Sequence, residues 1–432
     1  MLPDHSSSAY PSRSHWLLYL LLFTLLILLT PKAGHLTDVA CWVAWATHMD
    51  AYGLTSGYEV DTNNYNPLYQ YVLFGFGRLF HGADHIYRYR HLLKIVTLVF
   101  DFWGAIWAVR FFGWGDSNQR FLLSLLFLLN IGYMYDTMAW EQVDAILATL
   151  AFAAIVQALR RRVLSSLVLF VLTVNMKTQG IIFLPPLLLL WVPQWWLAPR
   201  RLVQGVLLAA AVQLLILLPY IVAGNVRTIV NLVYGAVGYF PIASMNCFNM
   251  WALLLHPYGV PDTTVWAGLT YKQWGLLSFM LASAVVLLPL GLRTLHKLRT
   301  RATFGPDDYA LVLLSLGLIP VVFCFFNTQM HERYWHPALI LLGSYAILRQ
   351  RYVLFCLFSA AYFLNLEAAF SFQLPPDKVH TTVLFWPEVV ACLFAVVLVG
   401  GIWQLYRREA GLRQTWQLLR QRAQPAAVAT AA

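Results

Sequence analysis

Residues 309–327 read YALVLLSLGLIPVVFCFFN, nineteen consecutive residues without a charged side chain. A helix of about 20 apolar residues is long enough to cross the hydrocarbon core of a bilayer, which is about 30 Å thick. The apolar residues follow one another without the alternation of a half-exposed strand, and an open strand edge would leave backbone groups unpaired in lipid. The stretch therefore predicts a membrane-spanning helix.

Similar runs recur along the chain. The other stretches that predict spans are 16–30, 91–112, 120–135, 142–159, 163–175, 179–192, 202–223, 273–292, 335–348, 352–371 and 385–406. The composition agrees, because 60% of the 432 residues are hydrophobic and only 11% are charged, whereas a soluble domain carries about 25% charged residues. We expect an all-α polytopic membrane protein with about twelve transmembrane helices in residues 1–406 and a basic, disordered cytoplasmic tail in residues 407–432.

The basic residues orient this chain. They gather in alternate connections, at Arg160-Arg161-Arg162, Arg200-Arg201, Arg293 to Arg301, Arg349 with Arg351, and Arg407-Arg408. The positive-inside rule places these connections, and both termini, in the cytoplasm. The net charge of +10 is thereby explained by topology, so nucleic acid is not an expected partner.

Two features of the topology need an interpretation. Residues 163–192 could cross the membrane once or twice, and only two crossings, broken near Lys177, keep the later basic clusters on the inner side. The run 16–30 is as short as a signal peptide, but no small-residue cleavage site follows it, so an uncleaved anchor is expected.

The five cysteines are scattered without a C-x-x-C motif, which favours buried thiols over disulfides or a metal site.

The longest outer loop, residues 31–90, carries helix signals of its own. Asp38, Cys41, Trp42 and Trp45 are spaced to share one helical face, with Asp38 in the first turn. Asn66-Pro67 then supplies a cap and a first-turn proline for a second helix, Leu68 to Phe80. We expect two amphipathic helices along the membrane surface.

The predicted topology also brings polar residues from several connections to the outer side. These residues are Asp38, Glu141, Asp144, Lys177, Gln179 and the triplet His331-Glu332-Arg333. Glu141 and Asp144 are three residues apart at a predicted helix end, so they are expected to share a face. Asp101 lies deep within a span, where we expect a buried polar contact between helices.

Taken together in this order, the motifs resemble the GT-C superfamily of membrane glycosyltransferases. The motifs are Asp38 with Trp42 and Trp45, Asn64-Tyr65-Asn66-Pro67-Leu68-Tyr69, Trp140-Glu141-Gln142-Val143-Asp144, Lys177-Thr178-Gln179 and Met330-His331-Glu332-Arg333-Tyr334. The chain is similar in particular to bacterial relatives of GPI mannosyltransferase II and of the polyprenol-phosphate-mannose-dependent enzymes, over about residues 35–340. One departure is Glu141, where such relatives often carry a glycine between tryptophan and glutamine.

The resemblance implies transfer of a sugar, mannose or another hexose, from a polyprenyl phosphate to a lipid or glycan acceptor, with inversion at the anomeric carbon. It makes Asp38 the base, and it makes the side chains of Lys177, His331 and Arg333 ligands of the donor phosphate. Contacts to sugar or acceptor are expected from Trp42, Trp45, Glu141, Asp144, Gln179 and Glu332. The lipid-linked sugar would be a co-substrate, with no cofactor and no metal, and membrane lipids would surround the chain. The absence of an N-x-S/T sequon favours a bacterial inner membrane.

Other interpretations stay open at this point. The two carboxylates Glu141 and Asp144 could form a structural ion-pair network with Lys177 and Arg333. The chain could be a secondary transporter or flippase, which would place charged residues on broken helices near the membrane centre. It could also be a non-catalytic subunit that binds a lipid carrier and does not need Asp38. The sugar, the acceptor and the oligomeric state are not predicted by the sequence.

Overall fold

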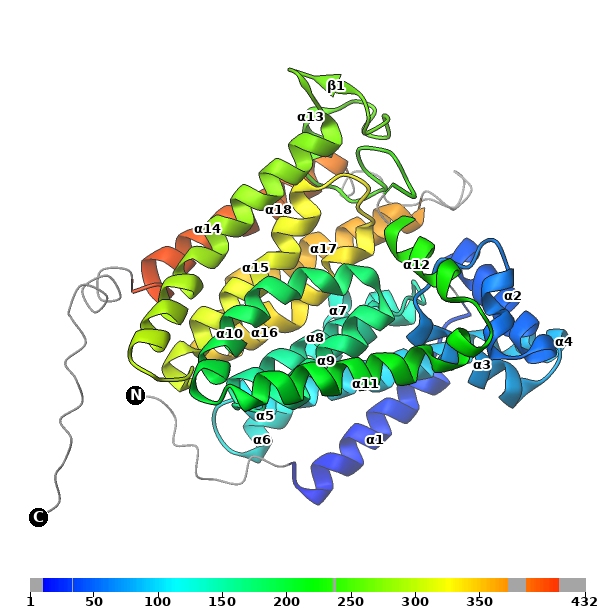
Figure 1. Ribbon diagram of the computed structural model, residues 1–432, viewed down its shortest axis with the longest axis horizontal. Coiled ribbons are helices and arrows are strands. Elements are labelled where there is room, and N and C mark those ends of the chain that lie inside the picture. The colour runs from blue at the N-terminus through cyan, green and yellow to red at the C-terminus, as the bar shows by residue number, and fades with distance from the viewer. Residues whose placement is uncertain (1–10, 33, 236–237, 372–385, 412–432) are drawn as a thin grey trace, which may run out of the picture.

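The computed structural model describes residues 11–32, 34–235, 238–371 and 386–411, and these residues are almost entirely helical. Most of the predicted tail, residues 412–432, lies outside the described part. Most of the helices run side by side as one bundle (Figure 1). They are α1 Arg13–Leu28, α5 Lys94–Phe112, α6 Ser117–Leu128, α7 Ile131–Met138, α8 Asp144–Leu159, α9 Val163–Met176, α10 Leu184–Leu197, α11 Arg200–Val222, α14 Tyr271–Arg299, α15 Tyr309–Phe326, α16 His336–Arg349, α17 Val353–Ser371 and α18 Pro387–Gln404.

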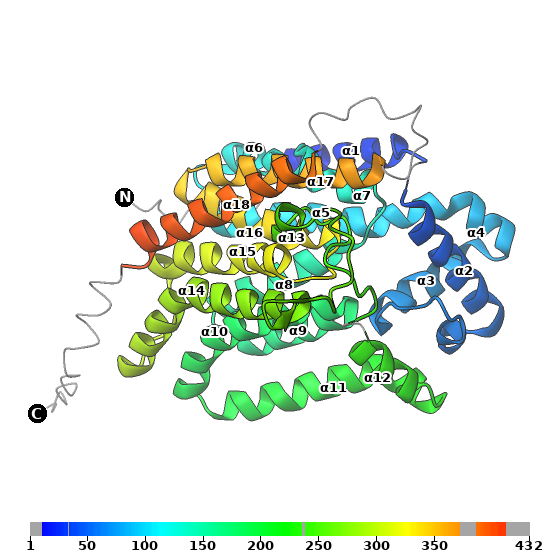
Figure 2. The ribbon, with the colours of Figure 1, turned by 90° about the horizontal axis from the view of Figure 1, so that it is seen from above.

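The remaining named elements gather beyond one end of this bundle (Figures 1 and 2). They are α2 Leu36–Tyr52, α3 Pro67–Phe80, α4 Ala83–Tyr89, α12 Val226–Gly235, α13 Met250–Leu254 and the hairpin of β1 Val265–Trp266 with β2 Leu269–Thr270. The strands are antiparallel, with Val265 opposite Thr270. The hairpin turn has positive φ at Ala267 and Gly268, as a two-residue turn between antiparallel strands requires.

Seven segments of the described chain are long and apolar enough to cross a membrane. They are Ala83–Phe112, Thr178–Leu197, Arg200–Val222, Tyr271–Arg299, Pro306–Phe326, Val353–Ser371 and Pro387–Glu409. The protein is therefore membrane-embedded. An eighth span results if the bent pair of α6 and α7 counts as one, and α1, α8 and α9 are shorter apolar helices. Helices occupy all twelve predicted segments, but the count of twelve crossings stays a prediction.

The structure corrects the segment 120–135, which was expected to be one helix. The chain bends by 57° between α6 and α7. Asn130 lies at the break, and its side chain accepts a hydrogen bond from the backbone N–H of Tyr133, which caps the new helix. An N-cap residue stops one helix and starts the next, and an apolar run does not reveal such a break.

Residues 163–192 form two helices that run in opposite directions. Lys177, between them, is extended, with φ −149° and ψ 138°. The chain then folds back along α9. As a result, the indole N–H of Trp191, near the end of α10, donates to the hydroxyl of Ser166, near the start of α9, at 2.8 Å. Two antiparallel helices therefore stand where one long helix was the alternative, whereas two crossings of the membrane stay a prediction.

The helices at the centre of the bundle are the most buried, and those at its edge are the most exposed. Helix α8 is buried along its whole length, and α15 and α16 are buried along most of theirs. Helix α11 lies along the outside of the bundle (Figure 2), and only Gly205, Ile216 and Tyr220 of this helix are buried. An apolar helix with so much exposed apolar surface is expected to face lipid.

The cysteines depart from the prediction of buried thiols. Cys247 and Cys324 are buried, but Cys41 is half-buried and Cys356 and Cys392 are exposed, and all five are free. The two exposed thiols lie on the apolar helices α17 and α18. Their position in apolar runs had predicted burial, but they lie on the exposed faces of these helices. An apolar run does not distinguish a side chain that faces lipid from one that faces another helix.

The ends of the bundle differ in charge. The basic turns lie at one end, where Arg349 pairs with Glu409 at 2.5 Å and Arg293 with Asp308 at 3.1 Å. The residues of the candidate site lie at the other end, at the start of α8, at the end of α9 and just before α16. The predicted separation of basic turns from the polar cluster is present in the fold, whereas the side of the membrane on which each end lies stays a prediction.

Candidate functional site

Helix α2 places Asp38 at the end of the bundle. The ring of His35 caps this helix, and its Nδ1 lies 3.3 Å from the backbone nitrogen of Asp38. His35 is itself held by Trp140, whose carbonyl accepts from the His35 backbone N–H at 3.0 Å and whose ring stacks on the imidazole at 5.0 Å. Asp38 therefore has a fixed position in the first turn, as predicted.

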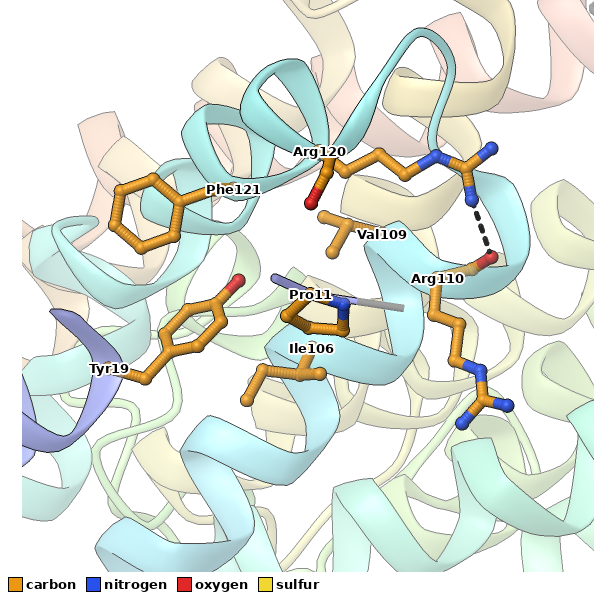
Figure 3. A pocket seen from close by; sticks show the side chains of 8 residues that line it. Pro11, Tyr19, Ile106, Val109, Arg110, Arg120 and Phe121 are labelled. Atoms are coloured by element: carbon orange, nitrogen blue, oxygen red, sulfur yellow. Dashed lines mark hydrogen bonds between the residues drawn. The ribbon is translucent and has the colours of Figure 1, made fainter. Parts of the chain in front are cut away.

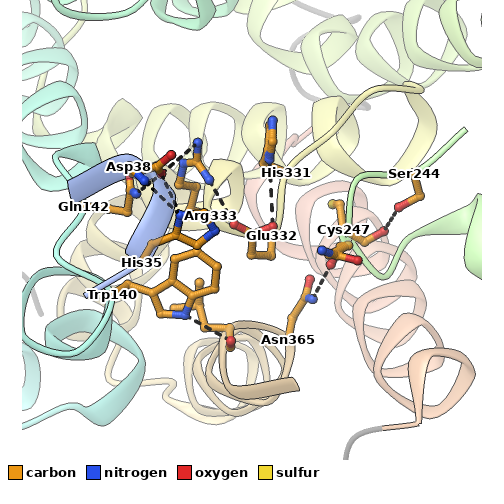
Figure 4. A network of polar contacts seen from close by, with 12 residues as sticks. His35, Asp38, Trp140, Gln142, Ser244, Cys247, His331, Glu332, Arg333 and Asn365 are labelled. Atoms are coloured by element: carbon orange, nitrogen blue, oxygen red, sulfur yellow. Dashed lines mark hydrogen bonds and ion pairs between the residues drawn. The ribbon is translucent and has the colours of Figure 1, made fainter. Parts of the chain in front are cut away.

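Three side chains contact the Asp38 carboxylate, two from distant segments and one from the cap of its own helix (Figure 4). The Gln142 amide donates a short hydrogen bond to Oδ2, the Arg333 Nη2 lies 3.6 Å from it, and the His35 Nδ1 lies 3.5 Å from it. The carboxylate is nonetheless 22% exposed. A hydroxyl group from outside can thus reach an oxygen whose orientation is already fixed.

The charge of Asp38 follows from these contacts. Burial raises the pKa of the carboxyl group, but the Arg333 guanidinium, together with His35 and Gln142, outweighs burial and holds the pKa well below its usual range. Asp38 is therefore a carboxylate at every physiological pH.

Asp144 links the two cations of the site. It is fully buried as the first residue of α8, and both its oxygens accept from Lys177 Nζ, at 2.8 and 2.9 Å. The Nε of Arg333 lies 3.8 Å from the same carboxylate, and the Gln179 amide donates to it at 3.4 Å. Asp144 is thus enclosed by protein groups and holds the two cations in place, whereas its contact with a sugar or acceptor stays a prediction.

The triplet His331-Glu332-Arg333 splits across the site (Figure 4). Arg333 points to Asp38, while Glu332 accepts from Arg333 Nη1 at 3.0 Å and His331 lies beyond Glu332, with 3.9 Å between Nδ1 and Oε2. Burial and the nearby Arg333 hold the pKa of His331 well below its usual value, so its ring is neutral. Two cations, Lys177 and Arg333, therefore supply the positive charge of this cluster.

Glu141 departs from the expectation that it shares a face with Asp144. Helix α8 begins only at Asp144, and Glu141 adopts a left-handed backbone with φ +62°. Its carboxylate turns toward α5, where His91 Nδ1 lies at 2.6 Å and Lys94 Nζ at 3.5 Å. Glu141 therefore belongs to a separate buried ion cluster and does not face Asp38.

Trp42 and Trp45 are also placed differently from the expectation of contact with sugar or lipid. Each is only 1% exposed. They pack under the rings of Tyr65 and Tyr69, with centroid distances of 5.5 to 6.1 Å. The two tryptophan rings therefore support the tyrosine rings of the first loop from the buried side, in keeping with the general tendency of tryptophan to be largely buried.

Three residues of the site were not singled out from the sequence. His35 and Gln142 bond to Asp38, and the ring of Tyr65 lies 5.6 Å from Lys177 Nζ. A signal existed for each, because His35 occupies the cap position before Asp38, and Gln142 and Tyr65 lie inside the motifs already quoted. The direction of each side chain was not readable from those motifs.

Asp101 lies in the contact that was predicted for it. It is fully buried in α5, and its carboxylate accepts from the Thr137 hydroxyl of α7 at 2.7 Å. The hydroxyl of Tyr133 donates to the Asp101 carbonyl at 3.1 Å. Asp101 therefore joins two helices, and the prediction of a buried polar contact is confirmed.

Hollows elsewhere in the molecule do not reach this cluster. One is lined by Tyr19, Ile106, Arg110 and Arg120 near the start of α6 (Figure 3), and another by Trp114, Leu122 and Tyr352. Both lie at the basic end of the bundle. Within the described ranges, three or more His, Cys, Asp or Glu side chains nowhere gather in a group that could hold a metal ion.

Comparison with known proteins adds no assignment. No protein-family model matches the chain, and no curated protein sequence matches it significantly.

Proposed function

We propose that the protein is a membrane glycosyltransferase that moves a sugar from a polyprenyl phosphate to a lipid or glycan acceptor, with inversion. The observation that carries the proposal is the convergence of a partly exposed, ionised carboxylate, Asp38, with two cations, Arg333 and Lys177, that a buried Asp144 holds together. A base beside fixed cations is what displacement of a phosphate leaving group requires. The resemblance of the motifs to the GT-C superfamily points to the same class.

The chemistry assigns a step to each group. The acceptor hydroxyl oxygen forms a bond to the anomeric carbon while the bond from that carbon to the phosphate oxygen breaks. The proton of the hydroxyl passes to Asp38, and the electron pair leaves with the phosphate. Arg333, with a planar set of donors, and Lys177, with a compact charge, stabilise the phosphate as it departs.

The position of the cluster favours an enzyme over a transporter. Asp144 begins α8, Lys177 follows α9, and Arg333 precedes α16, so these charges lie at helix ends. A transporter would hold its charged site between broken helices near the middle of the membrane. The site is proposed to face the outer side of a bacterial inner membrane, as the basic turns at the opposite end suggest.

The test is transfer of radiolabelled mannose from polyprenyl-phosphate-mannose in proteoliposomes that carry the full chain. Asp38→Asn keeps the shape of the side chain and removes the base, and we expect transfer to fall by about 100-fold or more. Asp84→Asn is the matched control, because Asp84 is exposed in the first turn of α4, outside the cluster. It should transfer as the wild type does.

Other results would contradict the proposal. Equal transfer by wild type and Asp38→Asn would remove Asp38 from the reaction. Movement of labelled lipid across the vesicle membrane without any product would favour a flippase. A screen of other hexosyl donors follows if mannose is not transferred, and failure with all of them would reject the enzyme.

A further inference from the structure

The first loop brings the ring of Tyr65 to one of the two cations, Lys177. Asn66 ties this loop to the α9–α10 turn, because its amide donates to the Val174 carbonyl at 2.7 Å and to the Thr178 hydroxyl at 3.2 Å. The preceding residue, Tyr65, is thereby brought against the turn. Its ring lies 5.6 Å from Lys177 Nζ, a cation–π contact.

Both the backbone and the ring of Tyr65 are fixed. The Tyr65 carbonyl accepts from the Tyr58 hydroxyl at 3.0 Å and from the Gln70 amide at 3.2 Å. The ring packs on Trp45 at 5.5 Å and on Tyr69 at 5.4 Å. The direction of the phenol group is therefore determined by the packing of the surrounding side chains.

The hydroxyl at the end of this ring has no partner. The oxygen of Tyr65 is buried, and no hydrogen bond to it forms within the described residues. A buried hydroxyl without a partner is costly, so native structures rarely keep one without a ligand or water. Burial, reinforced by the charge of Asp38, raises the pKa of this phenol well above its usual value, so it keeps its proton to donate.

The neighbours of the ring indicate what it would donate to. Lys177 is a cation and offers no acceptor, and Asp38 and Asp144 affect Tyr65 electrostatically without bonding to it. Among the described residues the Nε of Arg333 also forms no hydrogen bond, because the Asp144 carboxylate, its ion-pair partner, lies 3.8 Å away. The Tyr65 hydroxyl and the Arg333 Nε–H are thus donors without a hydrogen bond, and both lie in a cluster with two cations. An anion with several acceptor oxygens fits such a group.

We propose that the Tyr65 hydroxyl is a third donor to the phosphate of the lipid-linked substrate, beside Lys177 and Arg333. This assignment rests on the proposed function, because it names the residue that completes the phosphate site of that reaction. It also gives the buried Trp42 and Trp45 a role, since they support the ring that carries the donor.

The test is binding of farnesyl phosphate to the purified full chain in detergent, with farnesol as the uncharged control. Tyr65→Phe removes only the hydroxyl, and we expect the affinity for farnesyl phosphate to fall about 10-fold or more. Tyr220→Phe is the matched control. The Tyr220 hydroxyl is likewise buried and unpaired, but it lies in α11 beside Tyr58 and Tyr71, so its removal should leave the affinity unchanged.

The melting temperature without ligand separates a binding role from a structural one. Each substitution removes an unpaired buried hydroxyl, so neither should lower the melting temperature. A Tyr65→Phe protein that melts earlier and binds less well would show a structural role and overturn the proposal.

The failure of the two proposals would look different. If the wild type binds farnesyl phosphate and Arg333→Gln weakens binding while Tyr65→Phe does not, the assignment of Tyr65 is wrong and the proposed function stands. If the wild type binds neither farnesyl phosphate nor farnesol, both are overturned. Inorganic phosphate that competes at the same concentration as farnesyl phosphate would overturn the assignment to a lipid phosphate.

Discussion

Single residues determine how the proposed base behaves. The Asp38 carboxylate is held ionised although it is largely buried, because Arg333, His35 and Gln142 outweigh the effect of burial on its pKa. A group whose pKa is lowered by folding adds stability above its unfolded pKa, about 3.9 for aspartate, and this stability is lost as the pH falls through the folded pKa. Both activity and folding should therefore tolerate mild acid.

The first prediction concerns the acid side of the pH profile. The wild type should transfer sugar without an acid limb down to about pH 4. His35→Phe keeps a ring that can stack on Trp140 but loses the contact with Asp38, so the pKa of Asp38 should rise and the acid limb should move to higher pH. The measurement is kcat/KM against pH for both proteins. A wild-type limb near about pH 6, or no shift in the variant, would contradict it.

The second prediction concerns the backbone of Glu141. Its positive φ strains any residue other than glycine, and its buried carboxylate offsets this strain by pairing with His91 and Lys94. Glu141→Gln should lower stability by about 3 kcal/mol, because it breaks a buried ion pair. Glu141→Ala should be less stable than Glu141→Gly by about 1 kcal/mol, since both lose the pair and only glycine relieves the strain.

Thermal unfolding followed by tryptophan fluorescence measures this series. Equal melting temperatures for the glycine and alanine variants would show that the backbone strain is not real. A glycine variant more stable than the wild type would show that the ion cluster contributes less than the strain costs.

At the scale of elements, the α9–α10 turn decides where Lys177 lies. Gly180 packs against Thr173 so closely that an added Cβ would lie 2.7 Å from the Thr173 methyl carbon and 3.1 Å from its carbonyl oxygen. A side chain at this position would push the turn away from α9. The position of Lys177, three residues earlier, depends on that close approach.

The third prediction follows from this contact. Gly180→Ala should lower the stability by about 1–3 kcal/mol through overpacking, and it should also raise the KM for the lipid phosphate. Gly75→Ala in α3 is the matched control, because a Cβ there meets nothing within 4 Å, and it should be neutral or stabilising. Thermal unfolding and steady-state kinetics of the two variants decide, and equal behaviour would refute the role of the turn.

Elements also show what could be predicted from sequence. The second loop helix was predicted from Asn66-Pro67, and α3 does begin at Pro67. The side chain of Asn66, however, forms no cap and reaches Val174 and Thr178 instead. The basic clusters in alternate connections indicated that Asp38, Lys177 and Arg333 share one end of the bundle. This placement needs only the order of the helices along the chain, which the sequence contains. The turning of Glu141 toward α5 depends on one backbone angle and was not predictable from spacing.

At the scale of the whole molecule, the separation of charge between the two ends supports a fourth prediction. Tyr52 is 73% exposed at the far end of α2, the helix that carries Asp38, and Arg301 is exposed in the basic turn after α14. In a background without the accessible thiols Cys41, Cys356 and Cys392, Tyr52→Cys should react with an impermeant maleimide in intact cells. Arg301→Cys should react only after the cells are opened. The reverse pattern would invert the orientation and place the site in the cytoplasm.

The buried Asp144 gives the empty molecule its own counter-ion. Since Asp144 already neutralises Lys177 and lies beside Arg333, the phosphate of the proposed substrate would have to exchange with a carboxylate. Such exchange would discriminate against small anions from solution, which gain too little to displace the carboxylate, and would favour a ligand that a polyprenyl tail also anchors in lipid. When the product leaves, the same carboxylate takes its place again, so the site returns to a neutralised resting state after each turnover without help from ions in solution.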